Sequence, residues 1–145
     1  MAYEFKATRL VEFADTDMAG ILHFSNFFRY MEAAEHEFFR SLGFSVHSNG
    51  SDGAWGAARV HAECSYSAPL RYEDTVELHL LIREKGQRSI SYEVIFRKFV
   101  EQKPGPEIAR GKMTVVFLGK PAADGQLIAV PIPSAADAVL EVAPS

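Results

Sequence analysis

The feature that most constrains the fold is one long amphipathic helix pattern near the N-terminus. Apolar residues recur every three or four positions between 24 and 42, beside a more polar stripe. The apolar set is Phe24, Phe28, Met31, Ala34, Phe38 and Leu42, and the polar set is Arg29, Glu32, His36 and Arg40. Ser25 or Asn26 is suited to cap the helix start, and Gly43 is suited to end it. A helix this apolar must be covered by another layer of structure.

The rest of the chain supplies that layer as strand-like segments. Alternation of apolar and polar residues predicts five strands, over 3–13, 58–66, 74–84, 88–100 and 107–119. Short segments at 85–87 and 103–106 predict the turns between the later strands. The order of one strand, one long helix and four antiparallel strands predicts an α+β fold, with a curved antiparallel sheet wrapped around the central helix.

Length and composition indicate one domain over residues 1–145. The chain is 48% hydrophobic and shows no repeat, low-complexity tract or dividing linker. Residues 122–145 are expected to form a peripheral C-terminal extension without an assigned role. Within it, 123–125 predicts a turn, 127–131 a short extended piece, and the tail from Pro133 either a helical turn or a loose end.

Charge and composition exclude several classes of function. A net charge of −4 gives no general attraction to nucleic acid or anionic membranes. No apolar run is long enough for a membrane span, and the N-terminus lacks a signal-peptide apolar core. Cys64 is the only cysteine, so an internal disulfide and a CxxC metal site are both excluded. We expect a cytoplasmic protein that binds no metal, no nucleic acid and no membrane.

An acidic loop separates the first predicted strand from the helix. Residues 14–20 carry Asp15, Asp17 and Gly20 and interrupt both periodic patterns. Aspartates in such loops commonly bond nearby backbone amides. The same carboxylates lie just before a helix start, whose free amides favour negative charge. From spacing alone, Asp17 is therefore either a loop-bracing residue or a catalytic one.

The segment VEFADTDMAGILHFSN at 11–26 resembles the signature of the 4-hydroxybenzoyl-CoA thioesterase family, roughly D-x-D-x-x-G-x-x-(H/W/Y)-x-x-(Y/N). The helix continues in a similar way at 27–34, and YSAPLRYED at 66–74 resembles that family's second-to-third strand junction. The likeness follows the element order from about 3 to 120 and is most specific at 11–34. It implies a hotdog fold that hydrolyses an acyl-CoA thioester to free acid and coenzyme A, without a cofactor.

The resemblance also implies roles for individual residues. Asp17 becomes the nucleophile or general base, and the amides near His23, Phe24 and Ser25 become the oxyanion hole. Asp15 is expected to brace the loop. The residues expected around the acyl group are Gly20, Phe24, Asn26, Phe27, Tyr30, Trp55 and Val60, although the apolar ones equally suit core or subunit-interface positions. The Ser/Gly-rich loop before Trp55 is a candidate lid.

Coenzyme A is anionic, so an acidic protein must gather cations locally to bind it. Arg83, Lys85 and Arg88 surround one predicted hairpin, with Lys120 after the last long strand, and we expect Lys85 and Arg88 to bind the nucleotide. A solvated hairpin explains the same charges. The family implies a homodimer or homotetramer in which each site is made by two subunits.

Three alternatives remain open at this point. Glu32 or Glu35 on the helix is a second candidate carboxylate, although Glu32 lies about 12 Å along the axis from Phe24. His23 with Asp17 suits a hotdog hydratase or dehydratase, in which a histidine and a carboxylate remove a proton alpha to the carbonyl. The third is a non-catalytic acyl-CoA-binding protein on the same fold.

Overall fold

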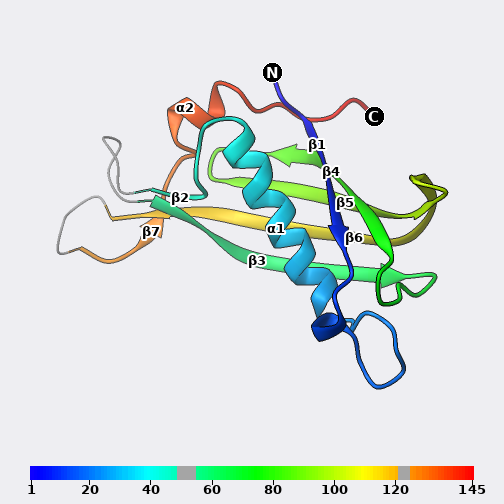
Figure 1. Cartoon of the computed structure of the whole chain (residues 1–145). Coiled ribbons are helices and arrows are strands. Elements are labelled where there is room, and N and C mark those ends of the chain that lie inside the picture. Colours follow the sequence, from blue (N-terminus) through cyan, green and yellow to red (C-terminus); the bar gives the residue numbers. More distant parts are fainter. Residues whose placement is uncertain (49–54, 121–124) are drawn as a thin grey trace.

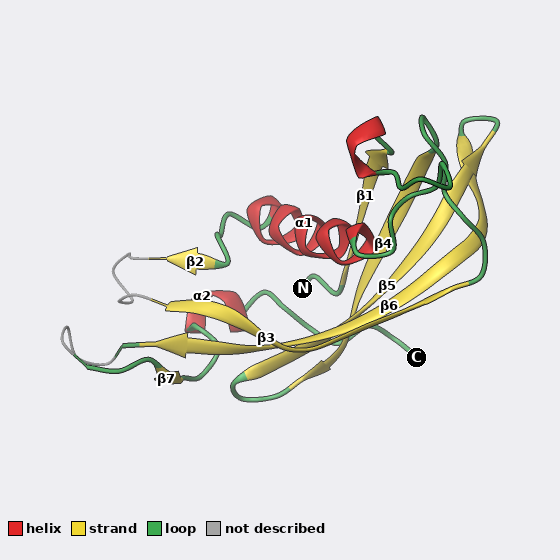
Figure 2. Cartoon of the chain, turned by 90° about the horizontal axis from the view of Figure 1, so that it is seen from below, coloured by secondary structure: helices red, strands yellow, loops and turns green. Residues whose placement is uncertain are grey.

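The computed structural model describes residues 1–48, 55–120 and 125–145 and places one long helix in the hollow of a curved antiparallel sheet (Figure 1, Figure 2). The strand order is β1-β4-β5-β6-β3-β2, and β7 also pairs with β6. This arrangement confirms the predicted α+β class. The elements are β1 (Glu4–Leu10), η1 (Phe13–Asp15), α1 (Asn26–Ser41), β2 (His47–Ser48), β3 (Trp55–Tyr66), β4 (Thr75–Lys85), β5 (Ser89–Val100), β6 (Lys103–Gly119), β7 (Ile128–Ala129) and α2 (Ser134–Asp137).

The core lies between one face of α1 and the concave face of the sheet. The alternating apolar residues predicted for β4 and β5 are buried there, and they are Val76, Leu78, Leu80, Ile82, Ile90, Tyr92, Val94 and Phe96. Fully burying one large apolar side chain contributes roughly 1.5–3 kcal/mol. The sheet and helix therefore hold each other in place, and the position of α1 is fixed along its whole length.

The buried face of α1 is turned slightly from the predicted one. Its buried residues are Asn26, Phe27, Tyr30, Met31, Ala34, Glu35, Phe38 and Phe39. Phe28 and Leu42 are only partly buried, and Phe24 precedes the helix with 62% of its surface exposed. The helix ends at Ser41, and Gly43 terminates it as predicted, with a φ of +88° that suits glycine. The Gly43 amide donates to the Arg40 carbonyl and the Phe44 amide to the Phe39 carbonyl, which satisfies the last turn.

Two boundaries differ from the sequence-based expectation. β1 ends at Leu10, and Phe13 lies in the short helix η1 with 75% of its surface exposed. The turn expected at 103–106 is wrong, because the chain reverses at Glu101 and Gln102, both with positive φ. β6 then runs through Pro104 to Pro106. Prolines are tolerated there because this end of β6 pairs only with β5.

The C-terminal segment is an integral part of the fold rather than a peripheral extension. β7 pairs with β6, and the Ala143 amide donates to the Ile82 carbonyl. Ala136 and Leu140 are buried in the main core. The tail from Pro133 forms α2, and the predicted turn at 123–125 lies mostly outside the described residues.

β2 and the start of β3 pair with each other on either side of the Ser/Gly-rich loop before Trp55. The candidate lid itself, residues 49–54, lies outside the described residues. No helix in the part of the chain described by the structure is long and apolar enough to cross a membrane.

Candidate active site

The acidic loop is folded into a tight turn at the entry to α1. The Asp17 amide donates to the Ile21 carbonyl at 2.8 Å, and the Gly20 amide donates to the Asp17 carbonyl at 3.0 Å. Gly20 has a φ of +81°, a conformation that residues with a Cβ rarely adopt. Ile21 also pairs with Arg71, so the segment after β3 lies against the loop. Gly20 therefore shapes the turn that presents Asp17.

The Asp17 carboxylate is anchored through one oxygen. Its Oδ1 accepts the Ala19 amide at 2.8 Å and the Ile21 amide at 3.4 Å. Its Oδ2 has no hydrogen-bond partner within the described ranges. The side chain is half-buried. Asp17 thus braces its loop, as one interpretation expected, through only one of its two carboxylate oxygens in the described part of the chain.

The three amides before α1 are not equivalent. The His23 amide donates to the Asp15 carbonyl at 2.9 Å, and the Ser25 amide lies 3.3 Å from Nδ1 of His23. The Phe24 amide has no hydrogen-bond partner in the described part of the chain. Unpaired amides at a helix entry carry the positive end of the helix dipole. Of the predicted oxyanion group, Phe24 is therefore the available donor.

Asp15 connects the loop to the helix. Its Oδ2 accepts the Tyr30 hydroxyl at 2.8 Å, and its carbonyl accepts Nδ2 of Asn26 at 2.8 Å. Arg29 approaches Oδ1 at 3.3 Å. Burial and the Asp15 carboxylate raise the pKa of Tyr30, so its hydroxyl stays a donor. These contacts fit the bracing role expected for Asp15. They also engage Asn26, which was expected around the acyl group but does not line the apolar hollow that opens beside Asp17.

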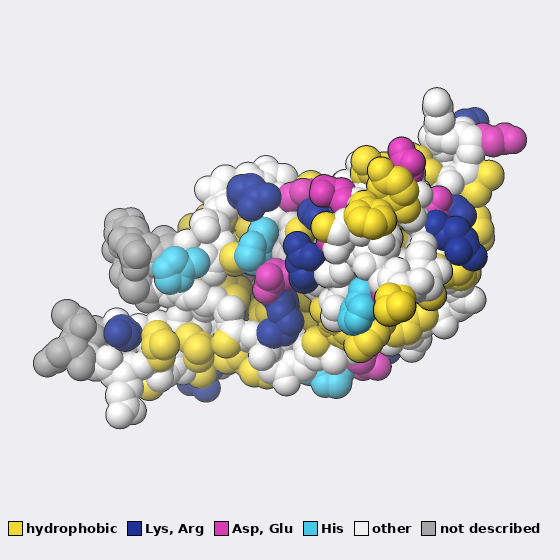
Figure 3. Space-filling model, turned by 60° about the horizontal axis from the view of Figure 1, so that its bottom comes forward, with side chains coloured by type: hydrophobic (Ala, Val, Ile, Leu, Met, Phe, Trp, Pro, Cys, Tyr) yellow, Lys and Arg dark blue, Asp and Glu magenta, His cyan; other side chains and the backbone are white. Residues whose placement is uncertain are grey.

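An apolar hollow of ≈ 450 Å³ opens beside Asp17. It is lined by Asp17, Ile21, Leu22, Phe24, Phe27, Tyr66, Ala68 and Pro69. Figure 3 shows hydrophobic side chains on the surface at this end of the molecule, in the right half of the view. Phe24 and Phe27, both expected around the acyl group, line this hollow. Tyr66, Ala68 and Pro69 were missed, although the 66–74 segment carried part of the family resemblance.

The structure separates Trp55 and Val60 from this hollow within one copy of the chain. Trp55 begins β3 and lines a second hollow of ≈ 370 Å³ with His47, Ala57, Ala58, Leu118, Lys120 and others. Tyr66, at the opposite end of β3, lines the Asp17 hollow. Val60 lies at an irregularity in the β3–β6 pairing and is 62% exposed. Tyr30 is fully buried below the loop and also lies outside the Asp17 hollow.

Lys85 and Arg88, the residues expected to bind the nucleotide, lie at the far end of the sheet from Asp17. β4 starts at Thr75, opposite Leu10, and ends at Lys85. Lys85 Nζ lies 2.9 Å from Asp137 Oδ1 and donates to the Leu140 carbonyl at 2.8 Å, so it holds the C-terminal segment. Arg88 is exposed. Within one copy, neither lies near the Asp17 carboxylate.

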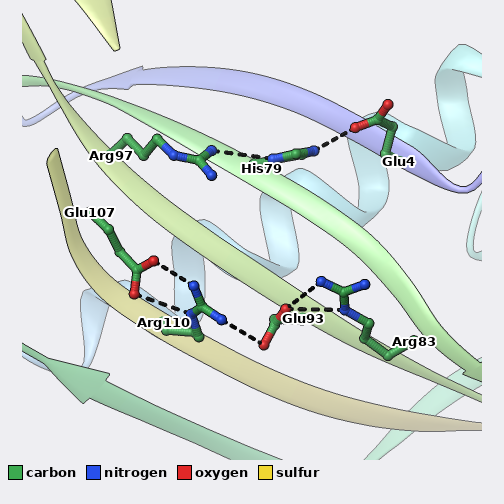
Figure 4. Close-up of polar contacts among 7 residues, drawn as sticks. All are labelled: Glu4, His79, Arg83, Glu93, Arg97, Glu107 and Arg110. Atoms are coloured by element: carbon green, nitrogen blue, oxygen red, sulfur yellow. Dashed lines mark hydrogen bonds and ion pairs between the residues drawn. The ribbon is translucent and has the colours of Figure 1, made fainter. Parts of the chain in front are cut away.

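Charged side chains on the outer face of the sheet are paired with one another (Figure 4). Glu93 lies between Arg83 at 2.8 Å and Arg110 at 3.4 Å. His79 lies between Arg97 and Glu4. Arg83, one of the charges around the predicted hairpin, is thus engaged by the buried Glu93.

Two alternative site chemistries find less support. Glu35 is 1% exposed, bonds Arg59 at 3.0 Å, and its other oxygen has no partner within the described residues. Burial raises its pKa despite the opposing effect of Arg59. Glu32 also pairs with Arg59. His23 Nδ1 lies 2.8 Å from Ser25 Oγ, and within the described ranges it forms no hydrogen bond or ion pair with Asp17, as a hydratase pair would.

The fold and this site define a hotdog-fold protein with an acidic loop at the entry to its central helix. The family profile of the thioesterase-like superfamily matches residues 11–140. The chain belongs to this superfamily and is a thioester hydrolase. The match runs through the C-terminal segment as far as α2 and the residues after it.

Three relatives show the extent of the similarity. A protein of Aquifex aeolicus (strain VF5) with a provisional designation as an esterase is 40% identical over 90 residues, 62% of this chain and 70% of that protein. A gentisyl-coenzyme A thioesterase has a TM-score of 0.77 at 33% identity, covering 92% of this chain and 99% of the other. The 4-hydroxybenzoyl-CoA thioesterase of Pseudomonas sp. strain CBS-3 has a TM-score of 0.75 at 20% identity, covering 92% and 96%, and shares the fold.

Proposed function

We propose that the protein hydrolyses acyl-CoA thioesters, with Asp17 as nucleophile or general base. The observation that carries this proposal is the Asp17 carboxylate itself. One of its oxygens is anchored by the Ala19 and Ile21 amides, while the other has no partner in the described part of the chain. An apolar hollow and the unpaired Phe24 amide lie beside it.

The chemistry follows from these positions. With the acyl group in the hollow, the Phe24 amide donates to the thioester carbonyl oxygen as that oxygen becomes anionic. Asp17 either attacks the carbonyl carbon or takes a proton from an attacking water. In the first route a mixed anhydride forms as the C–S bond breaks, and water then hydrolyses the anhydride. In both routes coenzyme A leaves as the thiolate and is protonated by solvent.

The hollow favours an aromatic acyl group. Phe27 and Tyr66 meet edge to face with centroids 4.8 Å apart, and such surfaces accept a further ring in an offset or edge-on geometry. Asp17 is the only charged residue among the described residues that line it. The relative at 33% identity named as a gentisyl-coenzyme A thioesterase supports the same class of acyl group.

The active unit in this proposal is a dimer that pairs the free edge of β3. Beyond Gly56, β3 has a partner strand on one side only, within the described residues. Antiparallel pairing of two copies about the middle of β3 would set the Trp55 end of one beside the Tyr66 end of the other. The Trp55 hollow, with Lys120 on it, would then extend the partner's site toward the coenzyme A moiety.

A free-thiol assay across aromatic and aliphatic acyl-CoAs tests the function. Wild type should release thiol, and Asp17→Asn should be slower by about 10²–10⁴-fold, the usual contribution of such a group. Asp137→Asn makes the same change in a 52% exposed side chain that pairs with Lys85 at the far end of the sheet, and should keep wild-type activity. No thiol release by wild type from any thioester would overturn the proposal.

Light scattering at several protein concentrations tests the dimer. Val60→Asp should shift the protein toward monomer and reduce thiol release, because it places a charge on the exposed middle of β3. Val142→Asp, at a 47% exposed position near the C-terminus, is the matched control. A monomeric wild type, or a fully active Val60→Asp dimer, would contradict this part of the proposal.

A further inference from the structure

Among the described residues that line the apolar hollow, Tyr66 is the only one besides Asp17 with a polar side chain. It is the last residue of β3, opposite Ala109 on β6, so its backbone is held by the sheet. Its ring packs edge to face on Phe27, which is 3% exposed and packs in turn on Phe96. The ring therefore has a fixed position beside the entry to α1.

The Tyr66 hydroxyl donates to the Phe24 carbonyl at 3.2 Å. Phe24 is the residue whose amide is unpaired in the described part of the chain. Within the described ranges its carbonyl otherwise accepts only the Phe27 amide, at a long 3.3 Å. Partial burial raises the pKa of Tyr66 to about 12, with a smaller effect from Cys64, so the hydroxyl remains a donor throughout any practical assay range.

We propose that Tyr66 is a positioning residue that holds the Phe24 amide in place for the thioester oxygen. The inference rests on the proposed function. The peptide groups on both sides of Phe24 must be fixed if its amide is to point at one place. The Asn26 amide fixes the preceding carbonyl, that of His23, at 2.9 Å, and Tyr66 fixes the following one. Preorganised donors of this kind stabilise an anion without reorganising during the reaction.

Tyr66→Phe isolates this role, because it removes one oxygen and keeps the ring that lines the hollow. Complete loss of an oxyanion donor costs about 10²–10³-fold in kcat, so a loosened donor should cost roughly tenfold. KM should stay within about twofold because the apolar lining is unchanged. Tyr72→Phe is the matched control, since Tyr72 lies in the segment between β3 and β4, is 52% exposed and packs on Phe13.

Steady-state thiol release by wild type, Tyr66→Phe, Tyr72→Phe and Asp17→Asn gives the test. The expected result is a lower kcat with unchanged KM in Tyr66→Phe alone, at a temperature well below its melting point. Wild-type kcat in Tyr66→Phe, or a change confined to melting temperature, overturns the positioning role and leaves the proposed function standing. Failure of wild type to release thiol overturns both. A raised KM with unchanged kcat would make Tyr66 a binding residue and also contradicts the inference.

Discussion

Replacing Asp15 by alanine is expected to lower the free energy of unfolding by about 1–4 kcal/mol. The change leaves the Tyr30 hydroxyl, which is 0% exposed, without its acceptor. A buried donor without a partner costs about 1–3 kcal/mol. The Arg29 contact adds about 0–1 kcal/mol, because its guanidinium side chain is 66% exposed.

Removing both partners is expected to cost less than the sum of the single changes. Tyr30→Phe alone should cost about 1 kcal/mol. In Asp15→Ala/Tyr30→Phe no hydroxyl is left unpaired, so the coupling energy should be about 1–2 kcal/mol. Urea unfolding followed by the fluorescence of Trp55, the single tryptophan, measures all four proteins. Additivity within about 0.5 kcal/mol would refute the proposed tether between loop and helix.

Two further predictions concern the core. Burial is the main cause that raises the pKa of Glu35, so near that pKa the folded protein holds a proton that the unfolded chain releases. The free energy of unfolding therefore falls as pH rises above about 4.3 toward the folded pKa. Glu35→Gln should flatten this part of the stability curve in urea titrations between pH 4 and 7. Equal slopes of unfolding free energy against pH in the variant and wild type would contradict the raised pKa of Glu35. Gly111→Ala places a Cβ 2.2 Å from Met31 Sδ, so it should cost about 1–2 kcal/mol, at the low end for overpacking because methionine is flexible. Adding Met31→Ala to Gly111→Ala should remove that extra cost. An unchanged urea midpoint in Gly111→Ala alone would show that Met31 of α1 does not pack tightly against β6 at Gly111.

Periodicity was enough to predict the fold. The alternation in β4 and β5 matches the buried residues closely, because burial against a single sheet imposes one period on each element. In α1 the predicted repeat matches the buried face at Met31, Ala34 and Phe38 only. The reversal at Glu101 and Gln102 could not be predicted in the same way. Both residues have positive φ without the glycine or asparagine that normally signals it, whereas the prolines nearby suggested a turn.

The candidate site was only partly predictable. Asp17, Phe24 and Phe27 share one hollow because they are close in sequence at the helix entry. Tyr66 reaches it through the β3–β6 register and the contact of Ile21 with Arg71, which no local pattern reveals. Lys85 looked like a free cation in the sequence, but its partners come from the C-terminal segment more than fifty residues later.

In the proposed mechanism the Asp17 carboxylate carries out chemistry rather than substrate binding. The direct test compares Asp17→Asn with wild type in two assays, single-turnover thiol release and binding of a thioether analogue that cannot be hydrolysed. We predict similar affinity for the analogue and thiol release slower by at least about 100-fold in Asp17→Asn. Thiol release at the wild-type rate, or a loss explained entirely by weaker binding, would contradict this role of Asp17.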